Sequence, residues 1–235
     1  MTGPDKTDFI QAPLFPTFLV IPIFDLIGAC KLVPVLVLQE PAHAAPLAEA
    51  LMAGELPCAE VTFRTAAACA CIKIMAQRSG LLVGAGTVIK VDQVKEAVDM
   101  GAKFIVSPGF FPKVVAYCVD HSIPIVPGVL TPTDIGMALD FGLSVVKFFP
   151  AEAAGGLNAL KAIAAPFGSA LRYIPTGGIG ENNLASYLAF PRVLACGGSW
   201  MVPDDLVRSG RFEEVTALIA RAVALARGSS AGAPG

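Results

Sequence analysis

The stretch TPTDIGMALDFGLSVVKFF, residues 131–149, holds one complete helix-then-strand unit and decides the fold. Thr131, Pro132 and Asp134 are typical of a helix N-cap, a first-turn proline and an acidic third position, and Gly142 is typical of a helix stop. The apolar run Ser144–Phe149 then predicts a buried strand. Such a unit, repeated, builds an α/β protein.

Similar apolar runs recur about every 20 to 27 residues along the chain, each followed by helical periodicity. Seven runs join the one just described: Val33–Leu38, Cys58–Phe63, Leu81–Gly86, Lys103–Ser107, Ile123–Val126, Leu171–Pro175 and Arg192–Cys196. Eight such units predict a single (β/α)8 TIM barrel. The alternative is an open doubly wound sheet, which the even spacing without a long switch connection disfavours. Between the runs, Val91, Val94 and Val98 are spaced for one buried helix face, with Gly101 past its end.

The domain boundaries follow from the same pattern. Residues 21–227 form the predicted barrel, and Ile21–Lys31 predicts a short helix that caps its bottom. Residues 1–20 are interpreted as an N-terminal extension, with disorder as one interpretation, and the glycine- and serine-rich residues 228–235 as a flexible tail.

Composition excludes several classes of function. A formal net charge of −2 provides no basic surface for nucleic acid or an anionic membrane. Prolines and charges interrupt the apolar N-terminal segment, which is therefore a poor membrane span, and the first residues lack a basic secretory signal. Six cysteines without a C-x-x-C pair and only two histidines, His43 and His121, predict buried thiols in the cytoplasm and no metal site.

Lys147 is the most informative polar residue, because it lies late in an apolar run and barrel active sites form at the carboxyl ends of the strands. Desolvation, aided by the Arg64 cation, would favour its neutral amine, a nucleophile that condenses with a ketone. Glu60 could then move protons and Arg64 could bind a carboxylate. The alternatives are a lysine that extends to the barrel mouth or pairs with Glu60 for stability, and a Glu60–Arg64 pair that has no catalytic role.

Three other motifs end predicted strands. Thr87 could donate its hydroxyl to the same carboxylate, or simply cap the strand. The glycine turns at Pro175–Ile179 and Cys196–Trp200 follow the last two strands, where many barrels bind phosphate on backbone N–H groups, and Ser199 would add a hydroxyl. Such glycine pairs can also mark ordinary tight turns.

Taken together, six ordered motifs closely resemble the signatures of the 2-keto-3-deoxy-6-phosphogluconate (KDPG) aldolase family, also called 4-hydroxy-2-oxoglutarate (KHG) aldolase. They are AEVTFRT (59–65), GAGTV (84–88), SPG (107–109), KFFPAE (147–152), PTGGI (175–179) and GGSW (197–200). The resemblance covers about residues 33–225. Phe63, where family members often carry leucine, and the first 20 residues, for which we recognise no family counterpart, depart from it.

The resemblance implies a role for each matching residue. Lys147 would be the Schiff-base lysine and Glu60 the general acid/base, while Arg64 and Thr87 would hold the pyruvyl carboxylate. Two residues would line the pyruvate pocket, Pro108 and Phe149. Four would bind the sugar and phosphate end: Thr176, Gly177, Gly178 and Ser199. The family is typically a cytoplasmic homotrimer that needs no metal or other cofactor and serves the Entner–Doudoroff pathway.

The predicted function is therefore a class I lyase that cleaves KDPG to pyruvate and glyceraldehyde 3-phosphate, with KHG as a further substrate. Three alternatives stay open: an aldolase specific for the galactonate epimer, a phosphosugar isomerase or synthase without a Schiff base, and a non-catalytic phosphosugar-binding barrel. The partner in each case is a small keto acid or phosphosugar.

Overall fold

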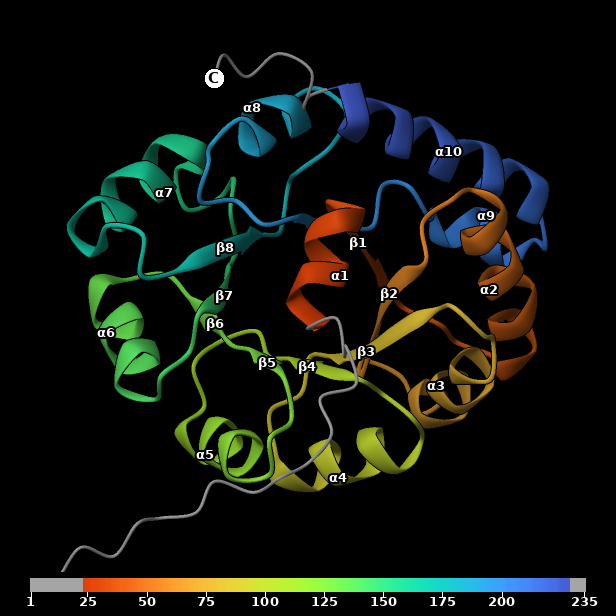
Figure 1. Cartoon of the computed structure of the whole chain (residues 1–235). Helices are drawn as coiled ribbons and strands as arrows, with labels where there is room; N and C mark the ends of the chain where they lie inside the picture. Colours follow the sequence, from red (N-terminus) through yellow and green to blue (C-terminus); the bar gives the residue numbers. More distant parts are fainter. Residues whose placement is uncertain (1–22, 229–235) are drawn as a thin grey trace, which may run out of the picture.

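The structure is a computed structural model that describes residues 23–228. It is an α/β fold in which parallel strands curl around a common centre and helices cover the outside (Figure 1). The strands are β1 (Leu32–Leu36), β2 (Cys58–Thr62), β3 (Leu82–Gly86), β4 (Phe104–Val106), β5 (Ile125–Val126), β6 (Gly128–Val129), β7 (Val145–Phe148), β8 (Arg172–Pro175) and β9 (Cys196–Gly198). The helices are α1 (Ile23–Cys30), α2 (Ala44–Ala53), α3 (Ala68–Ala76), α4 (Val91–Asp99), α5 (Pro112–Asp120), α6 (Pro132–Asp140), α7 (Gly156–Ala164), α8 (Leu184–Leu188), α9 (Asp204–Arg208) and α10 (Phe212–Gly228), with 3-10 turns at Pro41–His43 and Ala165–Phe167.

The strands form two parallel sheets. One has the order β5-β4-β3-β2-β1-β9 and the other the order β6-β7-β8. The sheets separate at Pro127, between β5 and β6. The predicted fifth strand, Ile123–Val126, is shortened to β5, and β6 follows it in the other sheet. Between β8 and β9 only isolated parallel bridges occur, Tyr173 with Val193 and Thr176 with Gly197. The alternation of strands and helices is as predicted, but the strands pair as two curled sheets linked by these bridges.

Two predicted details need correction. The last strand is Cys196–Gly198 rather than Arg192–Cys196, because β1 pairs with the glycines, Val33 with Gly197 and Pro34 with Gly198. On α4 the buried residues are Val94 and Ala97, whereas Val98 is 38% exposed. A helix turns by about 100° per residue, so Val98 lies one step beyond the buried face.

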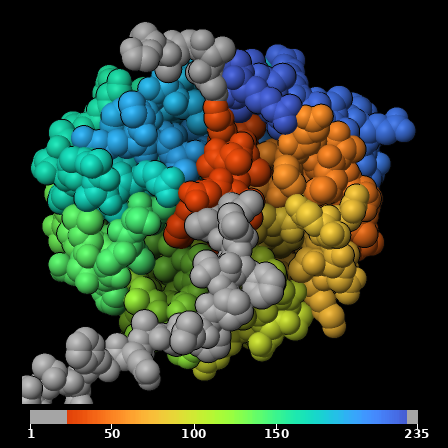
Figure 2. Space-filling model, in the orientation of Figure 1, coloured from red at the N-terminus to blue at the C-terminus, as the bar shows by residue number. Residues whose placement is uncertain are grey.

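The capping helix α1 is present and covers one end of the curled sheets. Its Ile27 is fully buried and packs with inward-facing strand residues such as Val33, Cys58 and Phe104. Figure 2 shows α1 filling the centre of this face, surrounded by the other elements. Residues 1–22 and 229–235 lie outside the described residues, and so do the predicted extension at 1–20 and nearly all of the predicted tail.

The inner core positions the site. Alternate strand residues point to the same face, so the residue two places after an inner-core residue also points inward, nearer the carboxyl end of the strand. Cys58, Val145 and Ile174 belong to the inner core. The residues two places later are Glu60, Lys147 and Thr176, all buried polar side chains. In the described part of the chain, no helix is both long and apolar enough to cross a membrane.

Candidate active site

Lys147 on β7 and Glu60 on β2 meet on the inner side of the curled sheets. The Lys147 Nζ donates to the Glu60 Oε1 across 3.4 Å, and the two side chains are only 7% and 4% exposed. This contact joins residues 87 positions apart in the sequence. The distance is longer than an ordinary hydrogen bond of about 2.7–3.2 Å, as is common for catalytic pairs before substrate binds.

Glycine on the neighbouring strand makes room for the Glu60 carboxylate. On β3, a Cβ at Gly86 would lie 2.0 Å from Glu60 Oε1 and 2.5 Å from its Cγ. Any larger residue at position 86 would therefore displace the carboxylate. Gly86, the last residue of β3, thus leaves the space that the acid occupies.

The alternative in which Glu60 pairs with Arg64 is not what the structure shows. Arg64 follows β2 and is exposed, and within residues 23–228 no carboxylate forms an ion pair with its guanidinium. Thr62, between them, donates its hydroxyl to the Leu36 carbonyl at 2.8 Å and so joins β2 to β1. Arg64 is thus left available for an anionic ligand.

A pocket of about 370 Å³ opens beside the buried pair. Phe149 connects the two, because the Lys147 Nζ lies 5.3 Å from the centre of its ring. Six of the ten predicted site residues line this pocket: Arg64, Phe149, Thr176, Gly177, Gly178 and Ser199. Residues from the ends of β2, β7, β8 and β9 thus converge on one place.

The remaining two predicted residues do not line this pocket. Thr87 directly follows β3 and Pro108 follows β4. Thr87 has a φ of +57°, a left-handed conformation that is rare for a β-branched residue. Strain of this kind concentrates at functional sites.

The glycine turn after β8 adopts a conformation that favours glycine. Gly177 and Gly178 have φ values of +100° and +78°. Gly197 on β9 leaves space for Thr176, since a Cβ at Gly197 would lie 2.3 Å from the Thr176 Oγ1. Ser199 follows this strand and is exposed. The two turns therefore form adjacent walls of the pocket, at the place where many barrels bind a phosphate.

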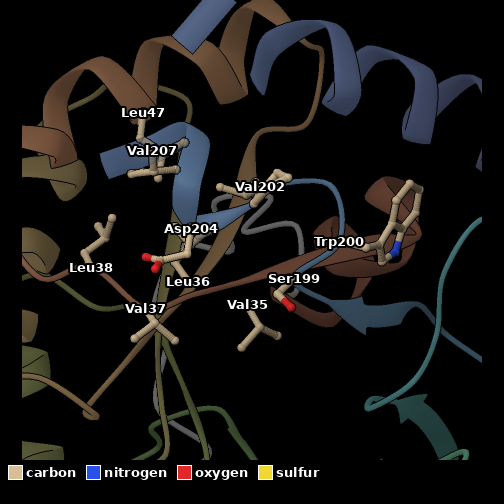
Figure 3. Close-up of a pocket in the computed structure, with 11 residues that line it drawn as sticks. Val35, Leu36, Val37, Leu38, Leu47, Ser199, Trp200, Val202, Asp204 and Val207 are labelled. Atoms are coloured by element: carbon tan, nitrogen blue, oxygen red, sulfur yellow. The ribbon is translucent and has the colours of Figure 1, made fainter. Parts of the chain in front are cut away.

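Other pocket residues were not predicted: Val35, Val37, Ile179, Gly198 and Trp200. A second hollow of about 310 Å³ shares Val35, Val37, Ser199 and Trp200 with the first. Figure 3 shows Ser199 and Trp200 along this hollow, with Val35 and Val37 at its lower edge in the view. The alternation of Val35 and Val37 late in an apolar run was the signal that could have identified them.

The ionisable groups of the pocket can support chemistry on a keto acid. A buried amine beside a carboxylate can form a Schiff base and exchange protons, and a free guanidinium can hold a carboxylate.

All six cysteines are free thiols. Among the described residues, no group of three or more His, Cys, Asp or Glu side chains could hold a metal ion.

Comparisons with known proteins agree with this chemistry. The model of the KDPG and KHG aldolase family matches residues 23–218. The 2-dehydro-3-deoxy-phosphogluconate aldolase of Treponema pallidum (strain Nichols) is 51% identical over 199 residues, which cover 84% of this chain and 94% of that protein.

Two solved structures of relatives contain bound molecules. The KDPG aldolase of Zymomonas mobilis ZM4 with 3-phosphoglycerate has 40% identity and a TM-score of 0.81, and the match covers 86% of this chain and 96% of that one. The KDPG aldolase of Legionella pneumophila, with pyruvate captured as a covalent carbinolamine intermediate, has 37% identity and a TM-score of 0.81, with 84% and 96% covered. The fold, the motifs and these matches together show that the chain belongs to the KDPG and KHG aldolase family.

Proposed function

We propose that this chain is a class I aldolase that cleaves KDPG to pyruvate and glyceraldehyde 3-phosphate through a Schiff base on Lys147. Membership of the family identifies it as a lyase of the pyruvate aldolase kind. The observation that carries the proposal is the buried Lys147 amine, 3.4 Å from the Glu60 carboxylate. The carbinolamine in the Legionella relative supports a covalent pyruvate intermediate in this family.

In the proposed reaction the neutral Lys147 amine attacks the C2 ketone, and loss of water leaves an iminium. Glu60 removes the proton of the C4 hydroxyl, and the C3–C4 bond breaks as its electron pair moves into the iminium. Glyceraldehyde 3-phosphate leaves, and the enamine that remains is protonated at C3 through Glu60. Hydrolysis of the pyruvyl iminium then frees pyruvate and restores the Lys147 amine.

The other predicted residues bind the two ends of the substrate. Arg64 and the strained Thr87 hold the pyruvyl carboxylate, while Phe149 and Pro108 shape the space around the pyruvyl methyl group. The phosphoryl group binds at the glycine walls of the pocket, formed by Thr176, Gly177, Gly178 and Ser199. The 3-phosphoglycerate in the Zymomonas relative supports a site for a phosphorylated three-carbon product.

The family description also includes KHG, so cleavage of KHG to pyruvate and glyoxylate is a second proposed activity. The galactonate epimer differs only at C4, where Glu60 acts, and is tested alongside. A phosphosugar isomerase or synthase without a Schiff base, and a purely binding barrel, are not favoured, because the matched relatives are aldolases and one of them holds pyruvate as a covalent carbinolamine.

The proposal extends to architecture and assembly. We propose that residues 21–227 form one closed (β/α)8 barrel, which assembles into a homotrimer in the cytoplasm. The isolated bridges between β8 and β9 support closure of the barrel. The six free cysteines support a reducing compartment. Size-exclusion chromatography with light scattering would test the trimer, and a mass of one or two chains would refute it.

The decisive activity assay couples pyruvate release to lactate dehydrogenase. The purified protein should release pyruvate from KDPG with a higher kcat/KM than from KHG or the galactonate epimer. Pretreatment with pyruvate and borohydride should abolish this activity. Activity that survives the treatment would refute the Schiff-base mechanism, whereas a higher kcat/KM for another keto acid would refute only the substrate.

A further inference from the structure

We propose that Glu152 is a positioning residue for phosphate recognition: its side chain, held by Tyr187, fixes the turn at residues 176–178 so that the amides of Gly177 and Gly178 face the phosphoryl group. This inference rests on the proposed phosphate site. Glu152 ends the KFFPAE motif, five residues after Lys147, and the mechanism above gives it no role.

The first observation is a hydrogen bond between helix α8 and the loop that follows β7. The Tyr187 hydroxyl, on α8, donates to Glu152 Oε1 at 2.5 Å. Tyr187 is only 1% exposed. Burial, and secondarily the Glu152 carboxylate, raises the pKa of Tyr187, so the phenol stays a hydrogen-bond donor at all physiological pH values. Glu152, although exposed itself, is therefore held from a buried anchor.

The second observation is that the Glu152 stem lies directly against the glycine turn. A Cβ at Gly178 would lie 2.6 Å from Glu152 Cβ and 2.7 Å from its Cγ. The Glu152 amide also donates to the Gly177 carbonyl at 3.0 Å, and the Ala151 amide to the Thr176 carbonyl at 2.8 Å. The loop that follows β7 thus holds the turn by its carbonyl groups.

The opposite side of the turn is held as well. Asn183 donates its Nδ2 to the Gly178 carbonyl at 3.2 Å and accepts from the Gly180 amide at 2.9 Å. The Thr176 amide donates to the Phe148 carbonyl at 3.0 Å, so with the carbonyls of the turn bound to protein, the N–H groups of Gly177 and Gly178 are left for a ligand. The Gly178 amide donates to no acceptor within residues 23–228, and Gly178 lines the pocket. Unpaired amides beside a glycine turn are suited to an anion.

The experiment measures phosphate discrimination, defined as kcat/KM for KDPG divided by kcat/KM for the dephosphorylated analogue 2-keto-3-deoxygluconate. Glu152→Ala removes the stem and the anchor, and should lower this ratio about tenfold through KM for KDPG, equivalent to about 1.4 kcal/mol. Glu152→Gln keeps both the stem and an acceptor for Tyr187, and should retain most of the ratio. Tyr187→Phe should lower the ratio about threefold, and the double variant Glu152→Ala/Tyr187→Phe should be no worse than Glu152→Ala.

Glu181→Ala is the matched control, because Glu181 is adjacent to the same turn but bonds outward to Arg221 on α10 at 2.5 Å. Its ratio should equal that of the wild type. If Glu152→Ala and Tyr187→Phe lower kcat/KM for both substrates by the same factor, or leave both unchanged, the inference is overturned. Should Glu152→Ala fail to fold, Glu152→Gln and Tyr187→Phe still decide the question. Absence of any discrimination in the wild type would instead refute the proposed phosphate site.

Discussion

Gly86→Ala is a one-carbon change that tests the geometry of the site. The added Cβ would lie 2.0 Å from Glu60 Oε1, and real Cβ atoms essentially never approach closer than 3.0 Å. The carboxylate must therefore retreat by about 1 Å, because the remainder of β3 is fixed by pairing with β2 and β4. A displacement of about 1 Å at a catalytic group costs on the order of 100-fold in rate. We expect kcat/KM for KDPG to fall by about that factor, equivalent to about 2.7 kcal/mol.

The assay is pyruvate release at saturating and limiting KDPG, together with thermal unfolding. Gly136→Ala is the control: Gly136 lies within α6 and a Cβ there would meet nothing within 4 Å. It should retain full activity, with a Tm equal to or above that of the wild type, since alanine is the better helix former. A Gly86→Ala enzyme within twofold of the wild type would refute the reasoning that Gly86 is required to seat Glu60.

Three further predictions follow from individual residues. Thr87→Gly should raise KM for KDPG while leaving the Tm unchanged or higher. Relief of the left-handed strain at Thr87, about 1–2 kcal/mol, outweighs the entropy cost of a glycine, about 0.5–1 kcal/mol. A Tm several degrees lower in calorimetry would contradict this. Lys147→Met should abolish turnover and destabilise the fold by about 3–5 kcal/mol, because Glu60 is left buried without its partner. Adding Glu60→Gln should restore the Tm but not the activity. Thermal and denaturant unfolding of both variants test this, and an unchanged Tm in Lys147→Met would contradict a buried ion pair. Iodoacetamide at neutral pH should modify Cys30 before Cys71 and Cys118, because a hydrogen bond with Cys58 lowers the pKa of Cys30. Burial raises the pKa of Cys71 to about 11 and of Cys118 to about 12, so these two thiols stay protonated and unreactive. Peptide mapping that finds Cys118 modified first would contradict this prediction.

Local chemistry allowed some elements to be predicted from the sequence. The helix at residues 131–140 forms as expected, with the Asp134 amide donating to Thr131 Oγ1 at 3.3 Å and the Asp134 carboxylate accepting from the Thr131 amide at 2.9 Å. Lys147 was identifiable because a lysine in an apolar run is costly to bury without a function or a partner. Here the functional and the stabilising interpretations coincide, since Glu60 is both its partner and the proposed acid.

Other features depend on contacts between distant parts of the chain. β9 consists of Cys196, Gly197 and Gly198, and glycines are poor strand formers, so the apolar run just before them was the stronger signal. Gly197 is in the strand because Thr176, 21 positions earlier, occupies the space where its side chain would be. That Trp200, which follows β9, lines the pocket depends on how the strands curl, and a pattern in one strand does not contain that information.

The central claim is that the buried Lys147 amine forms a covalent bond with the keto carbon of pyruvate. Incubation with pyruvate and borohydride, followed by intact-mass measurement and peptide mapping, tests it most directly. The account predicts one reduced pyruvyl group per chain, located on Lys147 and absent from Lys147→Met. An unmodified wild-type chain, or a label on any other lysine, would contradict it.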